Sequence, residues 1–236
     1  APRYVNTVHY RADRRGFLDQ GFVHLFVVPA DGGTARQLTR GDWNAGARFD
    51  GQPGSVGWSW TPDGASIVFD GLMSAESDKN YRDSDINVVD VATGAMRKIT
   101  SQRGTWSNPE VSPNGEWIAF SGFAYTEDTY HTSELYLMRR DGSGMKKISG
   151  TLDRDLGEIT WAGDNSGVYI NVQDRGSAHL YFVSVTGAVK PLSQGAQMLA
   201  VSSIAKNGTA AAVRSTPTEP PDVVTFAVST PQKVTR

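Results

Sequence analysis

The sequence predicts an all-β fold, a β-propeller built from four-stranded antiparallel blades. Two observations carry this prediction: polar hairpin turns recur before apolar runs, and each such hairpin is followed by a second one that closes on a hydroxyl residue. Apolar residues alternate or run in fours instead of recurring every three and four positions, so no amphipathic helix is expected.

The first hairpin of each copy has a polar turn directly before a strand rich in β-branched or aromatic residues. Asp-Gly and Asn-Gly favour such turns because both residues tolerate a positive φ. The turns lie at residues 61–64, 112–115 and 205–208, with a looser version at 163–167.

The second hairpin of each copy begins with an apolar strand, at residues 25–28, 86–89, 135–138, 180–183 and 223–226. A short strand then closes each copy on Thr39, Thr100, Ser149, Ser193 or Thr235. These closing positions recur at intervals of roughly 40–60 residues, close to the length of a propeller blade. The predicted complete blades are residues 55–100, 107–149, 157–193 and 199–235.

Residues 1–40 are predicted to be a partial blade, with strands at 4–10, 23–28 and 36–39 and no innermost strand. We therefore expect the chain to form an incomplete part of a seven- or eight-bladed ring. Open blade edges invite pairing with another chain, so self-association through them is also expected.

Composition narrows the possible partners. The formal net charge is -2, and the 23 basic residues form no stripe, which disfavours nucleic acid and membrane as partners. The absence of cysteine excludes disulfides, cysteine-ligated metals and a thiol nucleophile. No apolar run is long enough to span a bilayer. The sequence predicts no cofactor, and it leaves open a bacterial cytoplasmic or periplasmic location.

Residues 58–64, Trp-Ser-Trp-Thr-Pro-Asp-Gly, resemble the repeat shared by TolB-type propellers and the propellers of prolyl-oligopeptidase-family serine peptidases. Residues 10–18, 24–33 and 36–39 look like the middle of the propeller in bacterial acylaminoacyl-peptidase-like and dipeptidyl-aminopeptidase-like enzymes, and residues 216–223 resemble its last blade. The resemblance covers nearly the whole chain. It implies an α/β-hydrolase domain beyond the C-terminus, with a Ser-Asp-His triad, as the partner of a propeller that gates and positions short peptides.

No catalytic residue is predicted in the chain itself, because it contains no Gly-x-Ser-x-Gly nucleophile elbow. We expect the chain alone to hydrolyse nothing. Two other function classes stay open: a stand-alone TolB-like propeller that binds proteins, and a propeller hydrolase or lyase with its site in the central channel. The last ranks lowest, because no cluster of carboxylates or histidines recurs on the predicted innermost strands.

The predicted substrate-binding residues are Glu127, Asp128, Tyr130 and His131. They belong to an insertion at residues 123–132, and a second insertion at 73–83 lies in the preceding blade. Both follow a second strand, so they are expected on one face of the propeller, where long loops usually bind ligands. The carboxylates could hold a peptide's amino terminus beside the Tyr130 ring. A solvated connecting loop is the alternative.

Other candidate residues favour structural roles. His24 and His179 occupy equivalent places in the repeat, which indicates packing or turn bonding. No metal site is predicted, because the acidic runs at 78–85 and 153–158 do not match a full calcium-binding loop and are better explained as solvated charges. Inter-blade packing is expected for the aromatic residues Trp58, Trp60, Trp106, Trp117 and Trp161, with peptide binding as an alternative for Trp106.

Overall fold

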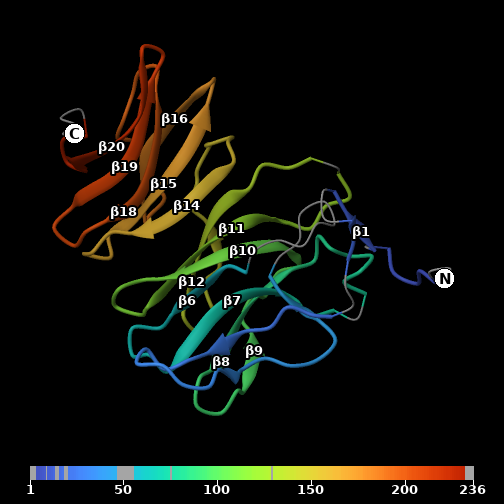
Figure 1. Ribbon diagram of the computed structural model, residues 1–236. Coiled ribbons are helices and arrows are strands. Elements are labelled where there is room, and N and C mark those ends of the chain that lie inside the picture. Colours follow the sequence, from blue (N-terminus) through green and yellow to red (C-terminus); the bar gives the residue numbers. More distant parts are fainter. Residues whose placement is uncertain are drawn as a thin grey trace. The chain divides into compact units, whose positions relative to one another are not determined.

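The computed structural model describes residues 4–8, 10–13, 16–18, 21–46, 56–74, 76–128 and 130–231. All regular structure in these ranges is β-strand (Figure 1). The prediction of an all-β chain with antiparallel four-stranded sheets is therefore confirmed. Across the same ranges, no helix has the length and apolarity needed to cross a membrane.

The strands β1 to β6 are two or three residues long, and from β7 onward all except β9, β13 and β17 are six to nine residues long. Their bounds are β1 (Arg11–Ala12), β2 (Gly16–Phe17), β3 (Phe26–Val27), β4 (Arg36–Gln37), β5 (Asn44–Ala45), β6 (Trp58–Trp60), β7 (Ser66–Leu72), β8 (Asp85–Asp90), β9 (Met96–Lys98), β10 (Gly104–Val111), β11 (Trp117–Ala124), β12 (Glu134–Arg139), β13 (Lys146–Lys147), β14 (Leu156–Trp161), β15 (Gly167–Asp174), β16 (Ser177–Ser184), β17 (Val189–Pro191), β18 (Met198–Ile204), β19 (Thr209–Thr216) and β20 (Glu219–Ala227).

The first complete sheet has a divided innermost strand. Both β5 and β6 pair with β7, Asn44 opposite Leu72 and Trp58 opposite Phe69, and β8 and β9 complete the sheet. Pairing in this sheet therefore begins at Asn44, ahead of residue 55, where the sequence predicts the start of this blade. The sequence pattern missed β5 because the polar Asn44 pairs with a strand far along the chain.

The following sheets are regular antiparallel meanders. One has the order β10-β11-β12-β13, and the next runs β14-β15-β16-β17. The last three strands, β18, β19 and β20, are antiparallel to one another, and a single parallel pair, Ala178 with Met198, joins them to β16. The predicted closing strand around Thr235 lies outside the described residues.

The N-terminal segment differs from its prediction. Residues 4–8 and 10 form no strand, and the pairs β1-β2 and β3-β4 each make a two-stranded sheet. The expected strand at 4–10 is therefore wrong, and those at 23–28 and 36–39 shrink to two residues each. Several apolar residues of this segment are exposed: Tyr4 is 90% exposed, Val8 61% and Val28 59%.

The closing hydroxyl residues fasten the second hairpin of the repeat. Thr39 Oγ1 accepts a hydrogen bond from the Leu25 N–H at 2.9 Å, and Ser193 Oγ accepts one from the Leu180 N–H at 2.9 Å. Thr100 makes the same contact with the Ile86 N–H at 3.3 Å. Each hydroxyl thus satisfies a backbone donor at the start of a third strand, which gives the recurring residue a structural reason.

The two repeat-equivalent histidines contact these hydroxyls. His24 Nδ1 lies 3.1 Å from Thr39 Oγ1, and His179 Nδ1 lies 3.4 Å from Ser193 Oγ. His24 also meets the Gly41 carbonyl oxygen at 3.0 Å through Nε2. The predicted bonding role of both histidines is confirmed.

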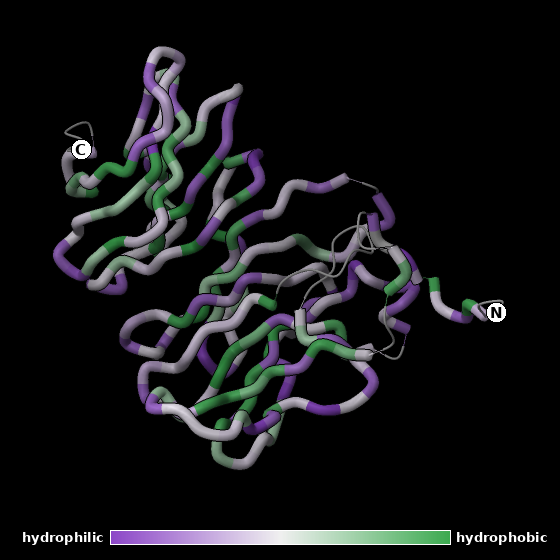
Figure 2. Tube along the Cα trace, viewed as in Figure 1, coloured by the Kyte–Doolittle hydropathy of each residue, from purple (hydrophilic) through white to green (hydrophobic). Residues whose placement is uncertain are grey.

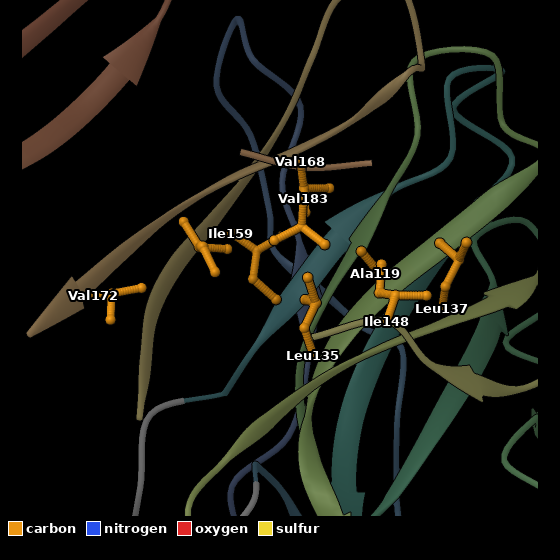
Figure 3. Packing of buried hydrophobic residues seen from close by; sticks show 9 residues of the cluster. Ala119, Leu135, Leu137, Ile148, Ile159, Val168, Val172 and Val183 are labelled. Carbon is orange, nitrogen blue, oxygen red and sulfur yellow. The ribbon is translucent and has the colours of Figure 1, made fainter. Parts of the chain in front are cut away.

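The chain divides into two compact units, residues Ala1–Pro109 with Ala124–Glu127, and Glu110–Phe123 with Asp128–Arg236. Figure 2 shows hydrophobic colour concentrated along the strands and hydrophilic colour at most turns. The first unit packs Leu38, Trp43 and Phe69 together. The second contains a core of aliphatic residues shown in Figure 3, formed by Ala119, Leu135, Leu137, Ile148, Ile159, Val168, Ile170, Val172 and Val183.

The tryptophans divide between core and surface. Trp106 is fully buried and donates to the Gln102 carbonyl oxygen at 2.8 Å, so it is a core residue, as favoured from the sequence. Trp58 and Trp60 are 52% and 42% exposed, so the prediction that they pack between blades is wrong for these two residues. They lie on the short strand β6, which pairs with β7 alone among the described strands.

Candidate functional site

The predicted substrate-binding loop is partly ordered by its own side chains. His131 Nε2 lies 3.3 Å from Asp128 Oδ2, and the His131 ring stacks on Phe123 with centroids 5.5 Å apart. Tyr130 is 75% exposed, and Glu127 is also exposed. The structure therefore brings Asp128 and His131 together and leaves the Tyr130 ring in contact with solvent.

Arg103 connects the two predicted insertions. Its Nε donates to Asp83 Oδ2 at 2.8 Å, and its guanidinium lies 3.6 Å from the centroid of the Tyr125 ring. This hydrogen bond to the Asp83 carboxylate raises the pKa of Arg103. The Tyr125 N–H also donates to the Arg103 carbonyl oxygen at 3.0 Å. Asp83 and Tyr125, one from each predicted insertion, thus contact the same arginine.

The far end of the 123–132 insertion is fastened to the acidic run at 153–158. The Ser133 N–H donates to Asp155 Oδ1 at 2.8 Å, and Thr132 Oγ1 lies 3.5 Å from Asp153 Oδ1. Arg154 donates to Asp174 Oδ1 at 2.7 Å, a hydrogen bond that raises the pKa of Arg154, and its Nη1 lies 4.0 Å from Asp153 Oδ2. The acidic run therefore has a defined place beside the predicted binding loop.

A pocket of about 880 Å³ opens beside these residues, within the second unit. Its volume suits a small ligand or a short stretch of peptide. The rim carries Tyr130, Thr132 and the acidic run from Asp153 to Glu158. Its apolar wall is formed by Leu156, Val172, Ala178, Met198, Leu199, Val201 and Val213.

Two irregular strands shape this pocket. The pairing of β14 with β15 shifts between Leu156 and Ile159, and that of β18 with β19 shifts between Val201 and Ser203. Residues at both shifts line the pocket. β-Bulges redirect side chains and are common beside binding sites. The strand irregularities therefore decide which side chains face the ligand space.

Asn171, which lines the pocket, joins two of its strands. Its Nδ2 donates to the Val201 carbonyl oxygen at 2.9 Å, and its Oδ1 accepts from the Val201 N–H at 3.2 Å. A Cβ on Gly157 would lie 3.1 Å from Asn171 Cβ and O, so glycine suits the close approach of β14 to this residue. The amide thereby fixes β18 against β15 with both of its polar atoms.

Of the four predicted binding residues, Tyr130 lines the pocket, and the other three lie on the same insertion. The sequence reasoning missed the pocket wall, because it comes from five strands of two successive repeats. The sequence singles out the acidic run at 153–158 only as an incomplete match to a calcium-binding loop, and it predicts solvated charges there. Among the described residues, no group of three His, Asp or Glu side chains is placed to hold a metal ion.

No protein-family model matches the chain. Two curated relatives match parts of it. An uncharacterized protein of Agrobacterium fabrum is 27% identical over 53% of this chain, and dipeptidyl-peptidase 5 of Porphyromonas gingivalis is 25% identical over 58% of it. The matched regions span 35% and 21% of the lengths of those relatives.

Several solved structures share the fold. TolB from Acinetobacter baumannii has a TM-score of 0.61 at 20% identity, over 88% of this chain and 47% of its own. The acylaminoacyl peptidase of Pyrococcus horikoshii has a TM-score of 0.56 at 19% identity, over 74% and 26%. The β-propeller domain of the Trilobed protease from Pyrococcus furiosus has a TM-score of 0.56 at 18% identity, over 78% and 52%.

An oligogalacturonate lyase in complex with manganese also matches, with a TM-score of 0.64 at 15% identity, over 91% of this chain and 59% of its own. These likenesses establish the β-propeller fold. They also confirm the predicted resemblance to TolB and to the propellers of peptidases.

Proposed function

We propose that this chain is the non-catalytic propeller of a serine peptidase, which gates and positions short peptides for an α/β-hydrolase domain beyond Arg236. The observation that carries the proposal is the place of Tyr130, which comes from the predicted binding insertion and lines a pocket large enough for a short peptide. The likeness of the fold to peptidase propellers supports it.

In this proposal, the residues of the insertion act by orientation. Glu127 and Asp128 attract the positively charged amino terminus of a peptide, because both carboxylates are exposed. His131 steadies Asp128 at 3.3 Å. Tyr130 offers a flat apolar ring with a polar tip. Such contacts raise the rate of cleavage by holding the substrate in line with a distant nucleophile.

A second candidate function is a TolB-like propeller that binds proteins and catalyses nothing. The match to TolB over 88% of the chain favours this alternative. In that case, the same exposed insertion would contact a folded partner instead of a short peptide. The two functions differ in whether the longer protein containing this chain cleaves peptides.

The test compares that longer protein with the 236-residue chain. Both are incubated with free and acylated aminoacyl chromogenic substrates. The proposal expects turnover by the longer protein and background rates for the chain alone, which lacks a nucleophile elbow. A longer protein that has no Gly-x-Ser-x-Gly sequence and cleaves none of these substrates would refute the peptidase assignment and support the TolB-like one.

A further inference from the structure

We infer that the pocket lined by β14, β15, β16, β18 and β19 holds the side chain of a lysine or arginine in a bound peptide. This inference rests on the proposed function, since it specifies which part of a peptide the propeller recognises. It concerns the pocket itself and a basic side chain, whereas Glu127 and Asp128 on the insertion were assigned to the peptide's amino terminus.

The charges around the pocket favour a cation. Asp153, Asp155 and Glu158 are exposed at its rim. The single basic residue of the lining, Arg154, is shared between Asp174 at 2.7 Å and Asp153 at 4.0 Å, which leaves Asp155 and Glu158 without a basic partner in the lining. The rim therefore has an excess of negative charge, which attracts basic groups and repels acidic ones. Glu158 lies where the pairing of β14 with β15 shifts register, so its side chain need not follow the regular alternation of side chains along β14.

The apolar wall favours a cation carried on a long hydrocarbon stem. Met198 and Val213 are 44% and 45% exposed, although they are apolar, and both line the pocket. Val172, Leu199 and Val201, which also line the pocket, are buried. Lysine and arginine pack their methylene groups on apolar surface while their charged heads stay hydrated near carboxylates. A small inorganic cation would leave this wall uncovered.

The site is held in shape before a ligand arrives. Asn171 bonds both backbone polar groups of Val201, which fixes β18 against β15. Asp155 is held by the Ser133 N–H at 2.8 Å. A wall and a rim fixed in this way lose little conformational freedom when the ligand binds, and this preorganisation favours affinity.

The experiment measures peptide binding to the 236-residue chain by isothermal titration calorimetry at low salt. The probes are two tetrapeptides with acetylated N-termini and amidated C-termini, Ala-Lys-Ala-Ala and the same sequence with norleucine in place of lysine. Norleucine keeps the hydrocarbon stem and removes the charge. The blocked ends remove any contribution from the amino terminus. We expect the lysine peptide to bind about tenfold more tightly than the norleucine peptide, the ratio that a few partly exposed ion pairs supply.

Variants then assign the charge effect to the pocket. Glu158→Gln combined with Asp155→Asn keeps the size of both side chains, and the amide oxygen introduced at position 155 can still accept from the Ser133 N–H. This double variant is expected to bring the lysine-to-norleucine ratio close to one. Glu116→Gln removes an exposed carboxylate of the same unit that does not line the pocket, and it should leave the ratio unchanged. Thermal unfolding of each variant checks that the fold is retained.

Three outcomes would overturn the inference. Equal binding of the lysine and norleucine peptides would refute it, while leaving intact the proposal that the propeller binds peptides. Binding of neither peptide would refute it and also count against peptide binding by this chain. A charge preference that survives the Glu158 and Asp155 replacements but disappears in Glu116→Gln would place the cation elsewhere.

Discussion

The contrast between Ser193 and Ser149 gives a sharp test of the structural account. Both serines close a repeat and both are buried, at 4% and 0% exposure. Ser193 Oγ accepts from the Leu180 N–H at 2.9 Å. No described residue provides a hydrogen-bond partner for Ser149 Oγ. Equivalent positions of the repeat therefore predict different effects of the same substitution.

The expected magnitudes follow from these contacts. Ser193→Ala leaves the buried Leu180 N–H without an acceptor, and such a group lowers the free energy of unfolding by about 1–3 kcal/mol. Ser149→Ala removes a buried hydroxyl that has no partner among the described residues, so the free energy of unfolding should change by less than about 0.5 kcal/mol or rise. Ser193→Thr keeps the hydroxyl acceptor that Thr39 and Thr100 supply in other repeats. It should therefore lower the free energy of unfolding less than Ser193→Ala does.

Urea unfolding followed by tryptophan fluorescence measures the three variants. Both serines belong to the same compact unit, so the variants should share one slope and differ in midpoint. Ser193→Ala should shift the midpoint to lower urea, and Ser149→Ala should not. Equal destabilisation by the two alanine substitutions would refute the reasoning that the hydroxyl acts through its hydrogen bond.

Two further predictions concern the first unit. Asp70 is buried, and its two carboxylate oxygens accept from the Gly57 N–H at 3.1 Å and the Asn108 N–H at 2.9 Å. In Asp70→Asn the new amide group would face one of these donors, so the free energy of unfolding should fall by about 1–3 kcal/mol in urea titrations, and an unchanged value would contradict the assigned bonds. Arg103→Lys keeps a positive charge beside Asp83 but loses the flat guanidinium over the Tyr125 ring. The ring protons of Tyr125 should shift in NMR spectra while stability changes by less than about 0.5 kcal/mol, and unshifted resonances would show that Arg103 does not hold the insertion.

The parts of the fold that depend on local chemistry could be predicted from the sequence. The turn at residues 61–64 needs Asp-Gly, and β7 follows it as expected. The hydroxyl of Ser193 is needed by a backbone donor within the same hairpin. The contacts of His24 and His179 are also local, because the partner of each is the closing hydroxyl of its own copy of the repeat. Such features recur in successive copies of the repeat, so a single sequence is enough to recognise them.

Features that depend on distant pairing could not be predicted in this way. The strand β5 exists because Asn44 and Ala45 pair with the end of β7, far along the chain. The pocket exists because strands of two successive repeats lie side by side, and its irregular pairings follow no residue pattern that marks them in advance. The N-terminal segment has the alternation of a strand, but residues 4–8 form none, and Tyr4 and Val8 are exposed.

The predicted binding residues were found for a general reason, namely their place in a long polar and aromatic insertion. That reasoning located Tyr130, which lines the pocket, and it grouped Asp128 with His131, which the structure brings to 3.3 Å. It did not identify Asp155 or Glu158 as members of the same region. Their proximity to the insertion depends on the hydrogen bond between Ser133 and Asp155, which joins segments from two repeats.

The central claim is that the insertion orients peptides for a hydrolase, and steady-state kinetics of the longer protein test it most directly. Glu127 and Asp128 are replaced together by alanine, with Glu116→Ala as the exposed-carboxylate control. The account predicts that the double variant raises KM about three- to tenfold for peptides with a free amino terminus, because two partly exposed ion pairs are lost. For acetylated peptides KM should not change, and the free energy of unfolding should stay within about 0.5 kcal/mol. Identical kinetics of the double variant and the unaltered protein on free and acetylated peptides would contradict the claim and leave the insertion as a connection between two strands.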